Sequence, residues 1–256
     1  MNKKTNKRVL IPIPALGSDP SEVAIPWKLF TQRGFEVVFI TPDGEQAIAD
    51  QIMLKGSNLG LLKSVLGARQ DAVDAYVEME KCDAFCQPLK YSEANAADFD
   101  ALHLPGGHDK TVRPYLESII LQKLVAGFFA AGKPVAAICH GVVLAARSKD
   151  PETGKSVLEG YQTTALLKSQ ELTGYNLTRL WMKDYYLTYP EITVEDEVRS
   201  VLADQQQFHK GPTPLLRDDE KHLNRGFALR DRNYLSARWP GDLYTYSLEF
   251  IKMIEA

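Results

Sequence analysis

The stretch that decides the fold is Pro134-Val135-Ala136-Ala137-Ile138-Cys139-His140-Gly141-Val142-Val143-Leu144-Ala145-Ala146. Its first part is a short apolar run typical of a buried strand, and its last part is an apolar helical stretch. A cysteine at a sharp turn between them would lie at the mouth of the sheet, with small residues on either side relieving the crowding. The first N–H groups of the helix would point at the sulfur and favour the thiolate. Residues 137–141 are therefore a candidate nucleophile elbow, although an inert buried thiol fits the same residues.

The composition of the chain narrows the class of protein. The 256 residues carry a net charge of -3, from 30 basic and 33 acidic side chains that are interspersed along the sequence. This pattern offers no charged footprint for nucleic acid or for an anionic membrane. No stretch approaches transmembrane length, and the basic residues 1–8 are not followed by the apolar run of a signal peptide. We therefore expect partners among small molecules or proteins, with no nucleic acid and no membrane.

The cysteines indicate the compartment and argue against a metal site. Three cysteines, an odd number in a long chain, favour a reducing compartment, so we expect a cytoplasmic protein. Cys82 and Cys86 form a C-x-x-x-C pair, but no second pair and no histidine at a zinc-like spacing accompany them. Two ordinary thiols are the better interpretation, and we expect neither a metal nor a cofactor.

Strands and helices alternate along most of the sequence. Strands are predicted at 8–13, 36–41, 99–104, 135–138, 162–166 and 233–238, and helices at 23–34, 115–131 and 243–254. The first strand, helix and strand span about 35 residues, which indicates a right-handed βαβ unit with parallel strands. The pattern predicts one α/β domain over residues 1–256, a doubly wound, mostly parallel sheet sandwiched by helices. Residues 46–98 are expected to form a cap or edge insertion, and residues 170–230 a variable segment.

Three predicted loops leave the carboxyl ends of parallel strands, the edge at which open α/β sheets bind ligands. They carry Glu22, the pair Gly106-Gly107, and Cys139. The glycines would let backbone N–H groups reach an oxyanion, and a buried Glu22 with a raised pKa would hold or move a proton. The backbone N–H of His140 is a further oxyanion donor, but its imidazole is not expected to act as the base for its own neighbour.

Each of these residues also has a purely structural interpretation. Glu22 could complement a helix dipole, Gly106-Gly107 could form an ordinary turn, and His140 could be a satisfied core histidine. Their convergence on one sheet edge is what favours a catalytic role.

Three segments resemble, in order, the signature blocks of the ThiJ/PfpI superfamily. They are Glu22-Val23-Ala24-Ile25-Pro26, Leu104-Pro105-Gly106-Gly107-His108 and Ala136-Ala137-Ile138-Cys139-His140-Gly141. The resemblance covers most of residues 8–147. Residues 237–242 resemble the family's late strand and final helix, but depart from its usual Asn-Pro-x-Ser wording. The resemblance implies a flavodoxin-like, class I glutamine amidotransferase-like fold.

The length of the chain makes it similar to the larger members, the heat-shock chaperone and glyoxalase III branch. That similarity implies cofactor-independent conversion of methylglyoxal, a small aldehyde, to lactate. Cys139 would form a hemithioacetal, Glu22 would move the proton that yields a thioester, and the Gly107 and His140 amides would hold the oxyanion. The resemblance further implies a carboxylate against His140, for which Glu171 is the candidate, and a possible homodimer.

Other functions fit the same residues. The main alternative is a stress-response chaperone or redox sensor in which Cys139 is oxidised to a sulfinate that Glu22 stabilises. A cysteine peptidase and an isocyanide hydratase rank lower. Glutaminase activity is not expected, because neither His209 nor His222 is part of the late His-x-Glu of true glutamine amidotransferases. Residues 46–98 and 175–197 are expected to border a small pocket.

Overall fold

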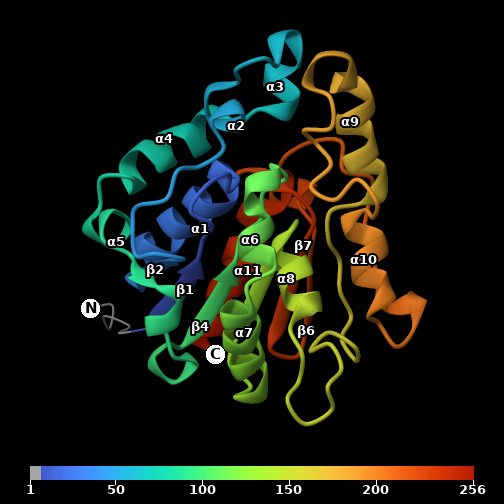
Figure 1. The fold of residues 1–256 in the computed structure, drawn as a ribbon. Helices are drawn as coiled ribbons and strands as arrows, with labels where there is room; N and C mark the ends of the chain where they lie inside the picture. The colour runs from blue at the N-terminus through green and yellow to red at the C-terminus, as the bar shows by residue number, and fades with distance from the viewer. Residues whose placement is uncertain (1–6) are drawn as a thin grey trace.

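The computed structural model describes residues 7–256, which build a seven-stranded sheet (Figure 1). The strand order is β3-β2-β1-β4-β5-β7-β6, and every neighbouring pair is parallel except β7 and β6. The strands are β1 Arg8–Pro12, β2 Glu36–Thr41, β3 Leu89–Lys90, β4 Ala101–Leu104, β5 Val135–Ile138, β6 Ala228–Asp231 and β7 Tyr234–Ala237.

Helices cover both faces of this sheet, as the doubly wound prediction requires. The α-helices are α1 Pro20–Arg33, α2 Gln51–Lys55, α3 Lys63–Leu66, α4 Gln70–Met79, α5 Asp83–Cys86, α6 Arg113–Leu116, α7 Ile119–Ala130, α8 Gly141–Arg147, α9 Lys168–Met182, α10 Val194–Ser200 and α11 Leu243–Glu255. Short 3₁₀ helices are η1 Gly60–Leu62, η2 Tyr91–Glu93, η3 Ala96–Asp98, η4 Lys110–Val112, η5 Gln205–Gln207, η6 Leu223–Arg225 and η7 Pro240–Asp242.

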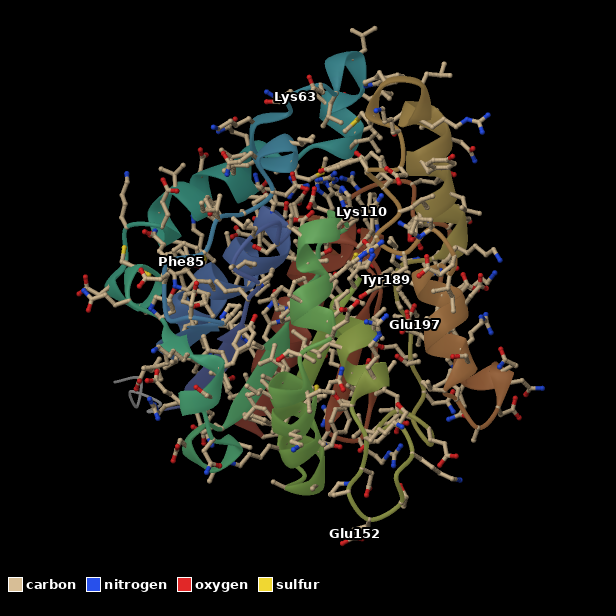
Figure 2. The ribbon with its side chains drawn as sticks, viewed as in Figure 1. Lys63, Phe85, Lys110, Glu152, Tyr189 and Glu197 are labelled. Atoms are coloured by element: carbon tan, nitrogen blue, oxygen red, sulfur yellow. The ribbon has the colours of Figure 1, made fainter. Side chains whose placement is uncertain are left out.

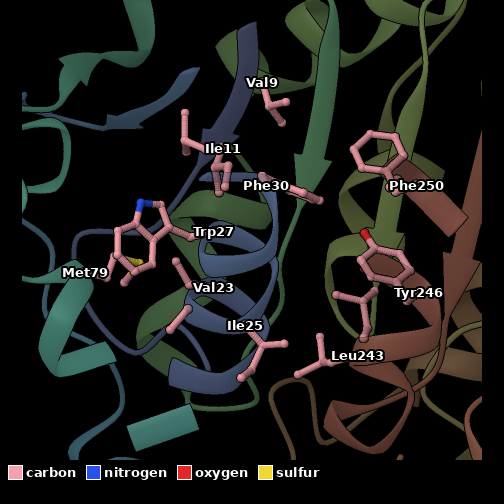
Figure 3. Packing of buried hydrophobic residues seen from close by; sticks show 14 of the residues in the cluster. Val9, Ile11, Val23, Ile25, Trp27, Phe30, Met79, Leu243, Tyr246 and Phe250 are labelled. Carbon is pink, nitrogen blue, oxygen red and sulfur yellow. The ribbon is translucent and has the colours of Figure 1, made fainter. Parts of the chain in front are cut away.

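Two hydrophobic cores lie on opposite faces of the sheet, because side chains alternate along a strand. In β5, Ala136 and Ile138 join the core that contains α1, α4 and α11, while Val135 and Ala137 join the core of α6, α7 and α8. Figure 3 shows the first core, in which the strand side chains pack against Phe30 of α1 and residues of α11. Burial on both faces explains why the parallel strands read as continuous apolar runs.

Most predicted elements are present, with three differences. The predicted helix 115–131 is two helices, because Ser118 caps a new helix by accepting the N–H of Leu121 at 3.3 Å. The predicted strand 162–166 is wrong: Thr163 forms only an isolated bridge to Phe208. The short strand β6 was not predicted; it pairs back on β7 through a tight turn at Arg232, whose φ is 55°.

The caps of α1 fix the segment that enters the site. The Asp19 carboxylate accepts the N–H groups of Ser21 and Glu22 at 2.7 and 3.2 Å, and Gly34 closes the helix in a left-handed conformation. Among residues 7–256, no helix is both long and apolar enough to cross a membrane.

Candidate active site

The predicted strand-turn-helix corner is confirmed at Cys139. β5 ends at Ile138 and α8 begins at Gly141, with Cys139 between them at a φ of 55°. A left-handed backbone at a residue other than glycine costs about 1–3 kcal/mol and is concentrated at functional sites. Gly141 allows α8 to begin against the neighbouring strand, because a Cβ at this position would lie 2.1 Å from the carbonyl oxygen of Leu104.

The imidazole of His140 faces the sulfur, contrary to the sequence-based expectation. Its Nδ1 lies 3.4 Å from the Sγ of Cys139. The expectation was wrong because it treated the two neighbours as ordinary consecutive residues, whereas the left-handed turn at Cys139 brings both side chains to one side. His140 is fully buried, and this burial lowers its pKa to about 3, so the ring is neutral near pH 7.

Thr188 sets the tautomer of His140, and sequence reasoning did not identify it. The Thr188 hydroxyl lies 2.6 Å from the backbone oxygen of His108, to which it donates its one proton. Its oxygen, 2.9 Å from Nε2 of His140, must therefore accept a proton that Nε2 carries. Nδ1 is then the unprotonated nitrogen and faces the thiol as an acceptor.

The segment that carries Thr188 is held by contacts with several other elements. The backbone oxygen of Thr188 accepts the Nε–H of Arg113 at 2.7 Å. Tyr189 and Glu197, labelled in Figure 2, both bond to Arg147, at 2.8 and 2.6 Å. Lys110 pairs with Asp184 at the other end of the segment. These contacts come from elements distant in sequence, so no local motif reveals them.

Glu22 lies in the first turn of α1 and is completely buried. Its Oε2 accepts the N–H of Gly106 at 2.8 Å, while its Oε1 has no hydrogen-bond partner among the described residues. Burial raises the pKa of Glu22 well above its ordinary value, Asp19 raises it further, and the neighbouring Cys139 and the Gly106 N–H oppose the rise. The carboxyl is thus held beside the thiol in a form that prefers its proton.

His103 holds the backbone of Glu22 from inside the core. Its Nε2 donates to the carbonyl oxygen of Glu22 at 2.8 Å, and its Nδ1 accepts the hydroxyl of Tyr246 at 2.8 Å. Burial lowers the pKa of His103 to about 4, which keeps the ring neutral. The signal in the sequence is a single polar residue in the otherwise apolar strand Ala101–Leu104.

The thiol of Cys139 is protonated at rest, so the predicted thiolate is not favoured. Cys139 is 5% exposed, and burial raises its pKa well above the ordinary value, with Glu22 and Asp19 adding to the effect. The N–H of His140 lowers the pKa but does not outweigh these causes. Activation of the sulfur must therefore accompany substrate binding, with the proton passing to a nearby acceptor.

Of the two predicted glycines, Gly107 keeps a free donor. The Gly106 N–H is used by Glu22, whereas the Gly107 N–H makes no hydrogen bond to another described residue. Both glycines are needed for close approach: a Cβ on Gly106 would lie 2.6 Å from the His140 nitrogen, and one on Gly107 would lie 2.5 Å from the Gly17 oxygen. The Gly107 and His140 amides are thus the candidate oxyanion donors.

Glu171 does not contact His140, which corrects its assignment as the carboxylate partner. It lies on α9, where its Oε2 accepts the N–H of Val194 at 3.0 Å, while the partner of His140 is Thr188. Glu171 nevertheless lines the cavity at Cys139. Burial raises its pKa to about 7.

A cavity of about 400 Å³ opens onto Cys139, and the expected small pocket is wrong. Since a water molecule takes roughly 30 Å³ of liquid, a three-carbon aldehyde would leave most of this volume empty. Asp19, Glu22, Gly107, His108 and Cys139 line the cavity from the sheet edge. The remaining walls come from α2, α3, α9, Tyr186, residues 213–215 and Arg217, together with Leu166 and residues 239–240.

The chain is similar to characterised proteins. It is 29% identical to a glutathione-independent glyoxalase of Schizosaccharomyces pombe over 59% of this chain and 60% of that protein. It is 27% identical to a deglycase of Thermococcus kodakarensis over 65% of this chain and 69% of that protein. An uncharacterised S. pombe protein is 33% identical, with 49% of this chain matched to 46% of that protein. The chain thus covers 60% or less of the length of both S. pombe relatives.

Solved structures share the fold. Glyoxalase III of Candida albicans superposes with a TM-score of 0.67 at 16% identity, covering 96% of this chain and 97% of that one. The Rapid Encystment Protein of Francisella tularensis gives 0.71 at 15% identity, covering 97% and 99%. The ThiJ/PfpI family-like model matches residues 13–212, a stretch that contains every candidate catalytic residue described above. The chain therefore belongs to the ThiJ/PfpI-like family.

Proposed function

We propose that this protein is a cofactor-independent enzyme that converts 2-oxoaldehydes to 2-hydroxy acids, with methylglyoxal to lactate as the reaction to test first. The observation that carries the proposal is that Glu22 and Cys139 line one cavity, while the unprotonated Nδ1 of His140 lies 3.4 Å from the Cys139 sulfur. The named glyoxalases and the deglycase among the relatives support the same chemistry.

The first step adds the thiol to the aldehyde. As the bond between Sγ and the aldehyde carbon forms, the thiol proton passes to Nδ1 of His140 and then to the aldehyde oxygen. The Gly107 and His140 amides stabilise the negative charge that develops on this oxygen. The product of the step is a neutral hemithioacetal.

The second step is a proton transfer by Glu22. Glu22 gives the proton that it holds at rest to the neighbouring ketone oxygen, and its carboxylate takes the hydrogen on the former aldehyde carbon as a proton, giving an enediol. Glu22 then returns this proton to the neighbouring carbon, while the hydroxyl on the former aldehyde carbon gives its own proton back to Glu22. This yields the thioester of a 2-hydroxy acid without any external oxidant. Water then adds to the thioester, the C–S bond breaks, and Cys139 recovers its proton. A raised pKa makes the Glu22 carboxylate a strong enough base for this role.

A substrate panel tests the proposal. The purified protein is incubated with methylglyoxal, glyoxal, a simple aldehyde, a peptide and an isocyanide, and the products are identified by NMR. We expect lactate from methylglyoxal and glycolate from glyoxal, with no turnover of the peptide or the isocyanide. Absence of acid from both 2-oxoaldehydes would refute the proposal.

The proposal also includes a homodimer, which size-exclusion chromatography tests, and a cytoplasmic location.

A redox sensor fits the geometry less well than the enzyme. Oxidation of a cysteine follows its thiolate character and exposure, and Cys139 is a buried, protonated thiol. Intact mass after mild peroxide distinguishes the two functions: a sensor gains two oxygens selectively at Cys139, whereas we expect no such selectivity here.

A further inference from the structure

The cavity at Cys139 has a buried end and an open mouth. Cys139 is 5% exposed, whereas three side chains that also line the cavity, Val65, Leu177 and Leu215, are 59%, 48% and 79% exposed. They come from α3, α9 and the segment 213–217, and Figure 1 shows α3 and α9 at the top of the molecule. These three apolar side chains therefore lie at the open mouth of the cavity.

The residues that line the cavity differ in polarity according to the part of the fold that supplies them. The sheet edge supplies polar groups, Asp19, Glu22 and His108, around Cys139. The segments that surround the mouth supply both kinds of residue. Met53 and Leu66 add to the three exposed apolar side chains, and the polar residues from these segments are Ser169, Gln170, Thr173 and Thr213. The apolar residues make up most of the exposed lining. A polar reaction centre followed by an apolar channel suits a molecule that is reactive at one end and apolar along its length.

Two charged groups interrupt the apolar walls, and both are engaged. Arg217 donates to the backbone oxygen of Val65 at 2.8 Å, and its guanidinium lies 5.6 Å from the Trp239 ring centre. The carboxylate of Glu171 accepts the Val194 N–H. These contacts hold the walls together and do not by themselves require a charged ligand.

The segments around the mouth are also fixed to one another, so the channel is a built feature. The indole N–H of Trp181 on α9 donates to the backbone oxygen of Asn58 at 2.8 Å. Tyr185 bonds to Asp50, the residue that caps α2. Met53, Leu59 and Tyr186 form a small hydrophobic cluster between these segments. The cavity of about 400 Å³ is therefore bounded by elements that are distant in sequence and contact one another.

We propose that the preferred substrates are 2-oxoaldehydes with an extended apolar substituent, an alkyl chain or an aryl ring, that lies along Val65, Leu177 and Leu215 while the carbonyls reach Cys139. This inference rests on the proposed function for the chemistry at the sulfur. The apolar channel itself does not depend on that chemistry and can be tested by binding alone.

The first measurement is kcat/KM for a series of straight-chain 2-oxoaldehydes from methylglyoxal to 2-oxooctanal. Burial of each added methylene should raise kcat/KM about threefold to fourfold until the channel is filled. The second measurement is binding of unreactive 2-alkanones, from butanone to 2-octanone, to the Cys139→Ala variant. Their Kd, read from tryptophan fluorescence because Trp239 lines the cavity, should fall with chain length in the same way.

Matched leucines provide the controls. Leu215→Ser and Leu177→Ser should flatten the dependence on chain length in both measurements. Leu216→Ser and Leu180→Ser change leucines that are 60% and 91% exposed and do not line the cavity, so they should leave the dependence unchanged. All four side chains are exposed, so the variants should fold.

A flat or falling dependence on chain length would overturn the inference while leaving methylglyoxal turnover intact. The inference would also be overturned if a ligand of equal length that ends in a carboxylate bound more tightly than the uncharged 2-alkanone, since Arg217 would then determine specificity. Ketone binding that strengthens with length in a protein with no turnover at all would support the channel and refute the proposed function.

Discussion

At the scale of single residues, the site depends on three buried groups that are all neutral at rest. Burial keeps the Cys139 thiol and the Glu22 carboxyl protonated and the His140 ring unprotonated. A site of this kind carries no buried net charge on these groups, which avoids the cost of an unpaired ion. In the proposed reaction, proton transfer from Sγ to Nδ1 generates the nucleophile only when an aldehyde is present to react with the sulfur.

Replacing Thr188 with valine should lower kcat about tenfold to a hundredfold, the range found for groups that orient a reactive ligand. Valine has a similar volume but cannot accept the Nε2–H of His140, so the ring loses its fixed tautomer. Thr188→Ser, which keeps the hydroxyl, should retain most activity. Steady-state kinetics on both variants, with circular dichroism to confirm folding, decide this. A kcat of Thr188→Val equal to that of wild type would show that the tautomer of His140 does not affect catalysis.

Glu171 should make stability depend on pH. Its pKa is raised to about 7 in the folded state, so between pH 4.5 and 7 the native protein binds more protons than the unfolded chain. This contribution is complete below pH 4.5 and is lost as pH rises through 7, by about 3 kcal/mol in total. Glu171→Gln removes the loss, because the amide oxygen can still accept the Val194 N–H.

Urea unfolding at pH 4.5 and pH 8 measures this effect. The free energy of unfolding of Glu171→Gln minus that of wild type should be about 3 kcal/mol larger at pH 8 than at pH 4.5. Glu152→Gln, at an exposed turn labelled in Figure 2, is the control and should show no such change. An advantage that is the same at both pH values would contradict the assignment of the titration to Glu171.

At the scale of elements, the corner between β5 and α8 positions the sulfur and depends on Gly141. Gly141→Ala places a Cβ 2.1 Å from a backbone oxygen of β4, which cannot move away as a flexible side chain would. We expect a loss of stability of about 2 kcal/mol or more, or failure to fold. Gly160→Ala, where a Cβ meets nothing within 4 Å, is the control. Thermal unfolding of both variants tests this, and wild-type stability of Gly141→Ala would contradict it.

The elements that the sequence predicted are those whose pattern is local. β1, β2, β4, β5 and β7 are short apolar runs, and α11 has an amphipathic helical pattern, so each could be placed within a few residues. The strand predicted around Thr163 was wrong because residues with high β propensity beside a turn resemble a strand, even when they pair only with a loop. β6 was missed because it is short and half-exposed, and only its partner strand makes it a strand.

The candidate site divides in the same way. Glu22, Gly107, Cys139 and His140 follow predicted strands or precede predicted helices, so topology alone brings them together. Thr188 could not be found, because its segment has no periodic pattern and reaches His140 through contacts with distant residues such as Arg113. The resemblance implied a carboxylate against His140, but it does not fix where a helix presents a side chain, and Glu171 bonds to Val194 instead.

At the scale of the whole molecule, two parts of the chain make different contributions to the cavity. The residues near the carboxyl ends of β1, β4 and β5 supply the reactive groups, whereas α2, α3, α9 and residues 213–217 supply the walls. In α/β folds the sheet holds the chemistry and the connecting segments vary around it. Under the proposed function, the size and apolar lining of the walls therefore select the carbonyl compound that enters, and Cys139 carries out the reaction.

The measurement that tests the central claim most directly is kcat/KM for conversion of methylglyoxal to lactate by wild type and Cys139→Ser. Serine keeps the geometry but is a far weaker nucleophile at this buried site, so activity should fall by about a thousandfold or more. Cys82→Ser, which alters a half-buried thiol outside the cavity, should stay within about twofold of wild type. A Cys139→Ser protein as active as wild type would show that the sulfur at the elbow is not the nucleophile.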